Sequence, residues 1–242
     1  MIAHVIPLRR FPRHLQLFDY VVPENLESSI AVGQLLQIPF RKSLLFGLVF
    51  DLSNETNDKL KEVDSIVCTT PIASKPYFEY IKNISERYAT SFGHTANIGM
   101  LPLQKRKLSK LKLEPLQENN SQEIARNVSV YSLHNEHAEK LQSSINQNTL
   151  IVAPEIYLLD EVFECLTEEQ KSNTVLWHSE LSQKEKFQRW LQIRNSEKTI
   201  VLSTRSGMLL PFPKLDTIIV DYEHDENHKQ WDGTPRIHVK IL

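Results

Sequence analysis

Three carboxylates stand directly after a run of strand-forming residues near the end of the chain. Residues 217–220 read Thr-Ile-Ile-Val, and Asp221, Glu223 and Asp225 follow them. Open α/β folds place their sites at the carboxyl ends of buried parallel strands, where a carboxylate can meet a metal ion. Taken alone, the stretch favours the alternative, an ordinary strand that ends in a solvated acidic turn.

The segments that precede this cluster repeat the same arrangement. Each is a run of β-formers that ends in polar residues, and polar, helix-compatible stretches separate them. A repeated order of strand, crossover and strand predicts a parallel sheet with right-handed connections, and therefore an α/β fold. The three runs are residues 149–153, 174–177 and 199–202.

Short strands broken by glycine and proline are predicted in the first half of the chain. They suggest a small twisted sheet or a partial barrel. Aromatic and aliphatic residues recur at helical spacing between Tyr77 and Tyr88, which predicts one amphipathic helix. The predicted strands lie within residues 2–8, 18–24, 33–40 and 44–50.

Composition narrows the class of protein. The 242 residues include no run of eighteen apolar residues, so no membrane span is predicted. The start lacks the pattern of a secretion signal, and Cys68 and Cys165 suggest neither a disulfide framework nor a zinc site. The histidines have scattered spacing, so no metal is expected. The expected location is a reducing cytoplasm.

Charge is spread unevenly along the chain. Residues 1–113 carry 15 Lys and Arg against 10 Asp and Glu, whereas residues 114–242 carry 13 against 20. A basic module joined to an acidic one fits a front end that binds a polyanion. Chance unevenness is the alternative, because the positive excess is modest.

The ordered motifs of the second half resemble the first motor lobe of the primosomal protein N′ (PriA) family, the bacterial replication-restart helicases. Each motif is weak by itself, whereas their order and spacing together are specific. The motifs are Val152–Ile156, His178–Ser182, Ser203–Ser206, Leu210–Pro213 and Val220–Asp225.

The first half resembles the 3′ DNA-binding domain at the front of the same family. The resemblance rests on the Phe-Asp-Tyr triplet at 18–20, the Ile-Pro-Phe triplet at 38–40 and the Leu-Lys pair at 60–61. In that family the domain captures the free 3′ end of a nascent strand at a stalled fork. The resemblance implies an end-binding pocket made of Phe18, Asp19, Tyr20, Arg41 and Lys61.

The chemistry of an end-binding pocket suits these residue types. An aromatic ring offers a stacking face to a terminal base of any kind. Asp19 can accept a hydrogen bond from a 3′-hydroxyl and repel a continuing phosphate, and Lys61 can pair with the last phosphate. Arg41 departs from the family, which has a glycine there that allows close approach or a positive φ. From the residues alone, the alternative places Phe18 and Tyr20 in the core, with Asp19 facing solvent.

Three features of the second half depart from an active motor. No glycine lies between residues 100 and 206, so the glycine-rich phosphate loop expected after a strand at 128–133 is missing. The family's Asp-Glu-Glu-His box reads Asp221-Tyr222-Glu223-His224, a vestigial acidic box. The chain stops at Leu242, and the second motor lobe is expected to be absent. Neither ATP hydrolysis nor a cofactor is therefore expected.

The resemblance also predicts how the chain is divided. Residues 1–104 are expected to form the 3′ DNA-binding domain, 105–125 a basic and polar linker, and 126–242 a degenerate RecA-like helicase lobe of the P-loop type. The family's winged-helix domain has no room between them and is taken as deleted. Further contacts to a DNA strand are expected from Arg205, Lys229, Trp231 and Arg236, unless these residues only hold the fold together.

The leading hypothesis is a PriA-like protein that binds DNA 3′ ends or forks in replication restart, without ATPase or helicase activity. Replication or repair proteins are its other expected partners. One alternative is a protein–protein interaction module of the replication and repair machinery. Another is a helicase fragment that a second chain completes.

Overall fold

The computed structural model describes residues 1–55, 57, 59–100, 111–116, 125–131, 134–229 and 237–239. The chain divides into two compact units, each with its own sheet. Unit 1 comprises Met1–Leu116, Leu209–Pro213 and Asp232–Ile237, and unit 2 comprises Gln117–Met208, Lys214–Trp231 and His238–Leu242.

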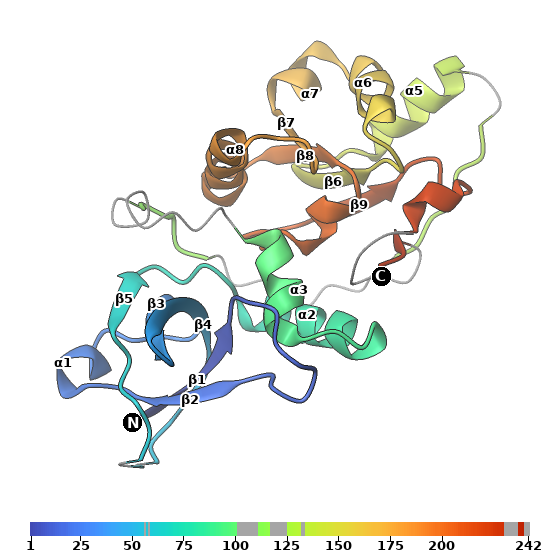
Figure 1. The fold of residues 1–242 in the computed structure, drawn as a ribbon. Helices are drawn as coiled ribbons and strands as arrows, with labels where there is room; N and C mark the ends of the chain where they lie inside the picture. The colour runs from blue at the N-terminus through green and yellow to red at the C-terminus, as the bar shows by residue number, and fades with distance from the viewer. Residues whose placement is uncertain are drawn as a thin grey trace. The chain divides into compact units, whose positions relative to one another are not determined.

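An antiparallel sheet forms the centre of unit 1 (Figure 1). Val21, at one edge of the sheet, forms a bridge with Glu62, which lies just before the strand at the other edge. The sheet therefore curls into the partial barrel that the short strands predict. Among the described residues its strands are β1 (Ile2–Pro7), β2 (Phe18–Val21), β3 (Leu35–Phe40), β4 (Ser43–Ser53) and β5 (Ser65–Cys68), in the order β2-β1-β4-β3-β5.

Alternate residues of these strands fill the inside of the sheet. Successive side chains of a strand point to opposite faces, so one apolar residue in two reaches the core. Ala3 and Val5 of β1, Leu36 and Ile38 of β3, and Val49 of β4 are fully buried in one cluster.

Three helices complete unit 1: α1 (Glu24–Glu27), α2 (Lys75–Arg87) and α3 (Phe92–Gly99). The Ser74 side chain caps α2 by accepting a hydrogen bond from the Tyr77 amide, and α2 covers most of the predicted helix. Helix α3 was not predicted, because glycine is a poor helix former. Packing requires the glycine instead: a Cβ at Gly93 would overlap with the carbonyl oxygen of Pro7. Helix α3 therefore lies directly against the end of β1.

Segment Leu209–Pro213 belongs to unit 1 although it comes late in the chain. The buried hydroxyl of Tyr77 donates a hydrogen bond to the carbonyl oxygen of Leu209 at 2.9 Å. A Cβ at Gly99 would overlap with the same carbonyl oxygen. Unit 1 is thus discontinuous in sequence.

A parallel sheet forms the centre of unit 2, as predicted. In its register, Leu150 stands opposite Val201 on one side and opposite Ile218 on the other. Each of the four predicted runs of β-formers is a strand. These strands, within the described part of unit 2, are β6 (Asn148–Val152), β7 (Thr174–Trp177), β8 (Thr199–Ser203) and β9 (Thr217–Val220), in the order β7-β8-β6-β9.

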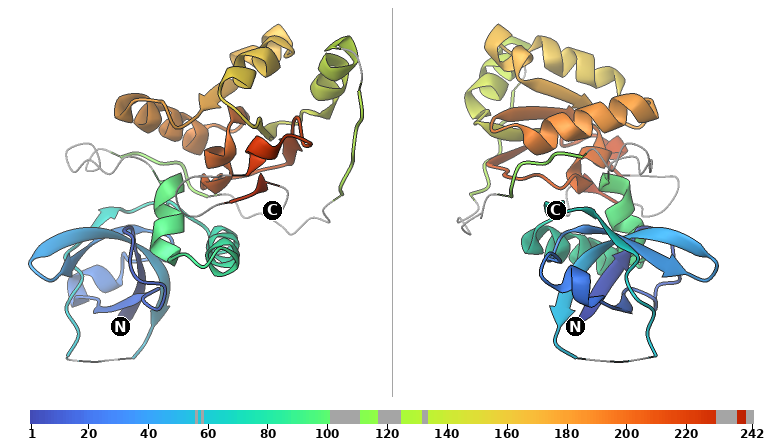
Figure 2. Two further views of the ribbon diagram at one scale, coloured as in Figure 1. Left: turned by 45° about the vertical axis from the view of Figure 1, so that its right-hand side comes forward. Right: turned by 90° about the vertical axis from the view of Figure 1, so that its left-hand side faces the viewer.

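Helices cover both faces of this sheet (Figure 2). They are α5 (His134–Ser144), α6 (Tyr157–Glu164), α7 (Glu168–Ser172) and α8 (Gln183–Asn195). The chain crosses from β6 to β7 in one direction and from β7 to β8 in the other, so right-handed connections put α6 and α8 on opposite faces. Leu141 of α5 and Leu159 of α6 pack with Ile151 and Leu202 on the α6 face.

The strand predicted for residues 128–133 is wrong for the part that the structure describes. Residues 125–131 are neither helix nor strand, and Val128 and Val130 are 75% and 85% exposed. Their alternating pattern suits a strand, but a strand also needs a partner to pair with. Among the described residues, β9 pairs with β6 alone.

Little of the predicted linker lies within the described residues. Residues 111–116 have no regular structure, and Leu113 is buried, which corrects the expectation of an exposed linker at that residue. The basic residues at 105–110 lie outside the described residues. None of the helices that the structure describes has the length and apolar character to span a bilayer.

Candidate nucleic-acid interface and acidic box

Three phenylalanines form an aromatic cluster on unit 1, made of Phe11, Phe18 and Phe40. Phe18 begins β2, Phe40 ends β3, and Phe11 lies in the loop that joins β1 to β2. The ring of Phe11 stands edge-on to Phe18 and Phe40, with centroids 5.0 and 5.1 Å away, and Phe18 stacks with Phe40 at 5.6 Å. All three rings are only partly buried. They keep surface free for a base to stack on.

Two cations flank this aromatic cluster. The guanidinium carbon of Arg41 lies 5.5 Å from the centroid of the Phe40 ring. The Lys61 ammonium donates a hydrogen bond of 3.4 Å to the carbonyl oxygen of Arg41. The carbonyl oxygen of Lys61 accepts a hydrogen bond from the Val21 amide, which places Lys61 beside the end of β2. The arrangement thus joins stacking faces to positive charge.

Arg41 adopts a backbone conformation that favours glycine, the residue that the family pattern has at this position. Its φ is +53°, in the left-handed region. A side chain in that region costs free energy that glycine does not pay. The turn between β3 and β4 therefore carries a cation at a position whose backbone favours glycine.

Asp19 and Tyr20 do not join the aromatic cluster. Tyr20 is 5% exposed, and its hydroxyl donates to the Pro39 carbonyl at 3.2 Å, while burial raises its pKa. Asp19 points to the opposite face of β2, where its carboxylate lies 2.7 Å from the Nδ1 atom of His4. The structure thus brings Phe18, Arg41 and Lys61 together around Phe40, and it places the other two predicted pocket residues elsewhere.

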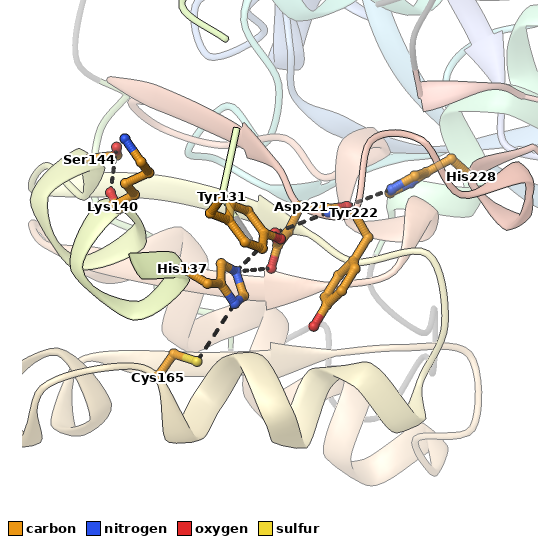
Figure 3. Close-up of polar contacts among 8 residues, drawn as sticks. All are labelled: Tyr131, His137, Lys140, Ser144, Cys165, Asp221, Tyr222 and His228. Carbon is orange, nitrogen blue, oxygen red and sulfur yellow. Dashed lines mark hydrogen bonds and ion pairs between the residues drawn. The ribbon is translucent and has the colours of Figure 1, made fainter. Parts of the chain in front are cut away.

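The acidic box of unit 2 is occupied by side chains of the protein itself (Figure 3). The Nε2 atom of His137 lies 2.9 and 3.0 Å from the two carboxylate oxygens of Asp221. Since a carboxylate only accepts, this nitrogen carries the proton. The Tyr131 hydroxyl and the Tyr222 amide also donate to Asp221, each at 3.0 Å. Asp221 is 5% exposed, so its hydrogen-bonding capacity is used inside the protein.

Aromatic rings enclose this histidine–carboxylate pair. Tyr131 stacks on the His137 ring at 4.3 Å, and the Tyr222 ring meets the same imidazole edge-on at 5.7 Å. The other nitrogen of His137 lies 3.9 Å from the sulfur of Cys165. Burial, followed by the Asp221 charge, raises the pKa of Tyr131, Tyr222 and Cys165, so these groups stay neutral.

The remaining box residues face solvent. Glu223 and His224 are exposed, and Glu223 lies 3.8 Å from Arg126. Tyr222 has φ of +49°, a strained conformation for an aromatic residue. Within the part of the chain that the structure describes, no three His, Cys, Asp or Glu side chains are placed to hold a metal ion.

The residues that were expected to contact a DNA strand differ in their surroundings. The Arg205 guanidinium donates to the carbonyl oxygens of Asn227 and Lys229, so it supports the turn that follows the box. Lys229 is partly buried and forms a bridge with His238. Trp231 and Arg236 lie outside the described residues.

Two groups of residues were not found from the sequence. Phe11 was missed because its contacts are made across a loop, and the only signal was its place among arginines 9, 10 and 13. Tyr131 and His137 were missed as partners of Asp221 because they lie about ninety residues away in sequence, at 90 and 84 positions. No local pattern reports such a contact.

Comparison with known proteins identifies unit 1. The family model of the 3′DNA-binding domain (3′BD) of PriA matches residues 5–102. The chain is 27% identical to the replication restart protein PriA of Rickettsia conorii over 241 residues, which cover 89% of this chain and 36% of the relative. It is also 27% identical to that of Helicobacter pylori (strain 26695) over 215 residues, which cover 81% and 34%. A PriA of Synechocystis is 35% identical over 96 residues, 40% of this chain and 12% of the relative.

The fold and these matches define the class of protein: a DNA-binding domain of the 3′BD type is followed by a parallel α/β unit. Residues 5–102 match the 3′DNA-binding domain of PriA, and the chain is similar to replication restart proteins PriA over about nine tenths of its length at modest identity. It spans about a third of the length of the curated relatives that it matches.

Proposed function

We propose that this protein binds DNA at 3′ ends or forks and acts in replication restart, together with replication or repair proteins in the cytoplasm. The match of residues 5–102 to the 3′DNA-binding domain carries the proposal. The half-exposed aromatic cluster beside Arg41 and Lys61 supports it, because stacking faces next to cations suit single-stranded DNA.

Each residue around the aromatic cluster has a defined task in this proposal. The exposed surface of Phe18 and Phe40 stacks with the terminal base, and Arg41 and Lys61 pair with phosphates. Tyr20 acts from within the core, because its hydrogen bond to Pro39 holds the end of β3 below Phe40.

Asp19 is proposed to select strand ends. Its side chain is 50% exposed, and it can accept a hydrogen bond from a terminal hydroxyl. Since Asp19 faces away from Phe18, the terminal sugar has to pass around β2, which among the described residues pairs only with β1 apart from the bridge at Val21. This requirement makes Asp19 the sharpest point at which to test end recognition.

Fluorescence anisotropy with labelled forks tests the proposal. We expect the protein to bind a fork with a free 3′-hydroxyl more tightly than a fork whose end carries a 3′-phosphate. The conservative variant Asp19→Asn should bind both forks with similar affinity. Equal affinity of the unaltered protein for the two forks would contradict end recognition, and no binding to either fork would contradict a DNA-binding role.

We further propose that the protein does not hydrolyse ATP. The missing glycine-rich loop supports this proposal, and so does the pairing of Asp221 with His137 at the start of α5. A metal ion that carries a triphosphate would have to compete with this buried pair. Titration with a fluorescent ATP analogue and Mg²⁺ is expected to give no saturable binding, and a micromolar Kd would overturn the proposal.

A further inference from the structure

A second candidate binding site adjoins the aromatic cluster on unit 1. It is a hollow of about 440 Å³ between the loop that joins β1 to β2 and the turn that joins α2 to α3. We call it the arginine hollow. Its lining residues are Arg10, Phe11, Pro12, Arg13, Ala89, Thr90 and Ser91.

The walls of the arginine hollow are tied together without the use of the guanidinium groups. The Gln16 side chain donates to the Arg13 carbonyl and accepts from the Phe92 amide at 2.6 Å. The Phe11 amide donates to the Ser91 hydroxyl at 3.4 Å, and Gly93 lets α3 lie against the end of β1. The shape of the hollow is therefore set before any ligand arrives.

Its two guanidinium groups have no acidic partner in the described part of the chain. Arg10 and Arg13 are exposed, and neither forms an ion pair with a described carboxylate. Residues 5–18 include three arginines and no Asp or Glu. The opposite wall offers the hydroxyl-bearing residues Thr90 and Ser91. Two forked donors over a polar hollow match the geometry of a phosphate group.

Phe11 connects the arginine hollow to the aromatic cluster. Its ring packs against Phe18 and Phe40, while the same residue lines the hollow. A nucleotide stacked on the cluster would therefore leave its sugar–phosphate backbone beside Arg10 and Arg13.

We propose that the arginine hollow binds a backbone phosphodiester of the DNA strand whose 3′-terminal base lies on the aromatic cluster. The inference rests on the proposed function, and it adds a contact on the 5′ side of the end pocket. The hollow would help to fix the direction of the strand, because it lies on the Phe11 side of the aromatic cluster, whereas Arg41 lies beside Phe40.

Salt dependence of DNA binding is the first test. The variant Arg10→Ala/Arg13→Ala removes two positive charges, and Lys82→Ala/Lys198→Ala removes two exposed charges elsewhere as the matched control. Each phosphate contact to single-stranded DNA adds roughly 0.7 to the slope of log affinity against log salt. We expect the arginine variant to lose about 0.7 to 1.4 of this slope and to bind a short oligothymidylate several-fold more weakly, with the control unchanged. An unaltered slope and affinity in the arginine variant would overturn the proposal.

A neutral backbone linkage identifies the group that is bound. One phosphodiester near the 3′ end is replaced by a methylphosphonate, at each linkage position in turn. At one of these positions the replacement should weaken binding of the DNA to the unaltered protein. The same replacement should not weaken binding to the arginine variant. Equal weakening in both proteins would overturn the proposal. In a parallel NMR titration, amide signals of Thr90 and Ser91 that shift with inorganic phosphate but not with DNA would assign the hollow to a free anion and also overturn it.

The tests separate this inference from the proposed function. In one outcome, the unaltered protein binds forks with free and blocked 3′ ends equally, while the arginine variant shows a smaller slope of log affinity against log salt. That result would support phosphate binding in the arginine hollow and contradict end recognition. If end preference is present and the slope is unchanged in the arginine variant, end recognition stands and the hollow fails.

Discussion

In unit 1, the rings of Phe11, Phe18 and Phe40 stay partly exposed beside cations, whereas in unit 2 the rings of Tyr131 and Tyr222 enclose His137 and Asp221. Both groups combine aromatic and charged side chains. In unit 1 the charges have no described acidic partner, and in unit 2 each donor meets an acceptor within the protein. A group whose hydrogen bonds are already satisfied has little to offer a ligand. The aromatic cluster of unit 1 therefore keeps stacking faces and cations available to a ligand, whereas the acidic box of unit 2 makes its hydrogen bonds within the protein.

The largest expected effect comes from opening the closed site. His137→Ala leaves the buried carboxylate of Asp221 without its main partner, and breaking a buried pair in this way typically costs about 3–5 kcal/mol of stability. Urea unfolding followed by tryptophan fluorescence measures this loss of stability, because Trp177 and Trp190 are both buried in unit 2.

The double variant His137→Ala/Asp221→Asn is the control for this prediction. It removes the charge as well as its partner, so part of the lost stability should return. A loss below about 1 kcal/mol in His137→Ala would show that water reaches the carboxylate and that the pair is not closed.

Removing a ring from the open cluster should weaken DNA binding. Phe18→Ala deletes a stacking face, and such changes typically cost about 1–3 kcal/mol of binding free energy per base. Anisotropy with single-stranded DNA measures the loss. Tyr157→Ala, which removes a 62% exposed ring in unit 2, should leave the affinity unchanged. Phe18→Leu keeps most of the packing and loses the flat face, so full affinity in this variant would argue against stacking.

Arg41→Gly should change stability and binding in opposite directions. Glycine relieves the left-handed conformation, which costs about 1 kcal/mol for other residues, so thermal stability should rise. DNA affinity should fall, because a cation beside Phe40 is lost. Arg41→Lys, which keeps both the charge and the strain, should change neither property greatly. A rise in both stability and affinity would remove Arg41 from the binding surface.

The smallest expected effect is a dependence of unit 2 on pH. Burial lowers the pKa of His178 and His228 below their usual value near 6.5. His228 donates to the Asp221 carbonyl through Nε2 at 2.7 Å, and its other nitrogen is buried without a hydrogen bond among the described residues. Below about pH 6.5 the unfolded chain therefore binds more protons than the folded chain, and stability falls as pH falls.

Urea midpoints measured by tryptophan fluorescence at a series of pH values check this dependence. The midpoint should be highest above about pH 6.5 and should decline steadily toward pH 5. Replacing both residues, as in His178→Gln/His228→Asn, should flatten the decline. A midpoint that rises on acidification would mean that the two imidazoles are stabilised in their charged forms.

Much of the fold could be predicted because the deciding signals are local. Runs of β-formers that end in polar residues predicted β6, β7, β8 and β9. The same kind of signal failed for residues 128–131, the described part of another predicted strand, since pairing depends on a neighbouring strand and not on alternation alone. Helix α3 escaped prediction for a similar reason: Gly93 is required by the approach to Pro7, which is a contact made across the unit.

The candidate sites were predicted less completely. The family resemblance grouped Asp19 and Tyr20 with Phe18, although the period of two along a strand sets Asp19 on the other face. The alternation of side chains along β2 therefore predicts which way Asp19 points, whereas the Phe-Asp-Tyr motif does not. The partners Phe11 and His137 come from elements far along the chain, and only the folded structure brings them to Phe18 and Asp221.

The discontinuity of unit 1 bears on where the protein can be cut. A truncation after residue 116 would remove Leu209, and the buried Tyr77 hydroxyl would lose its acceptor, typically at a cost of about 1–3 kcal/mol. It would also strip the backbone against which Gly99 packs. A front half cut there would expose part of its core, and the shortest expression boundary that preserves the whole unit lies at or beyond Ile237, where its last segment ends.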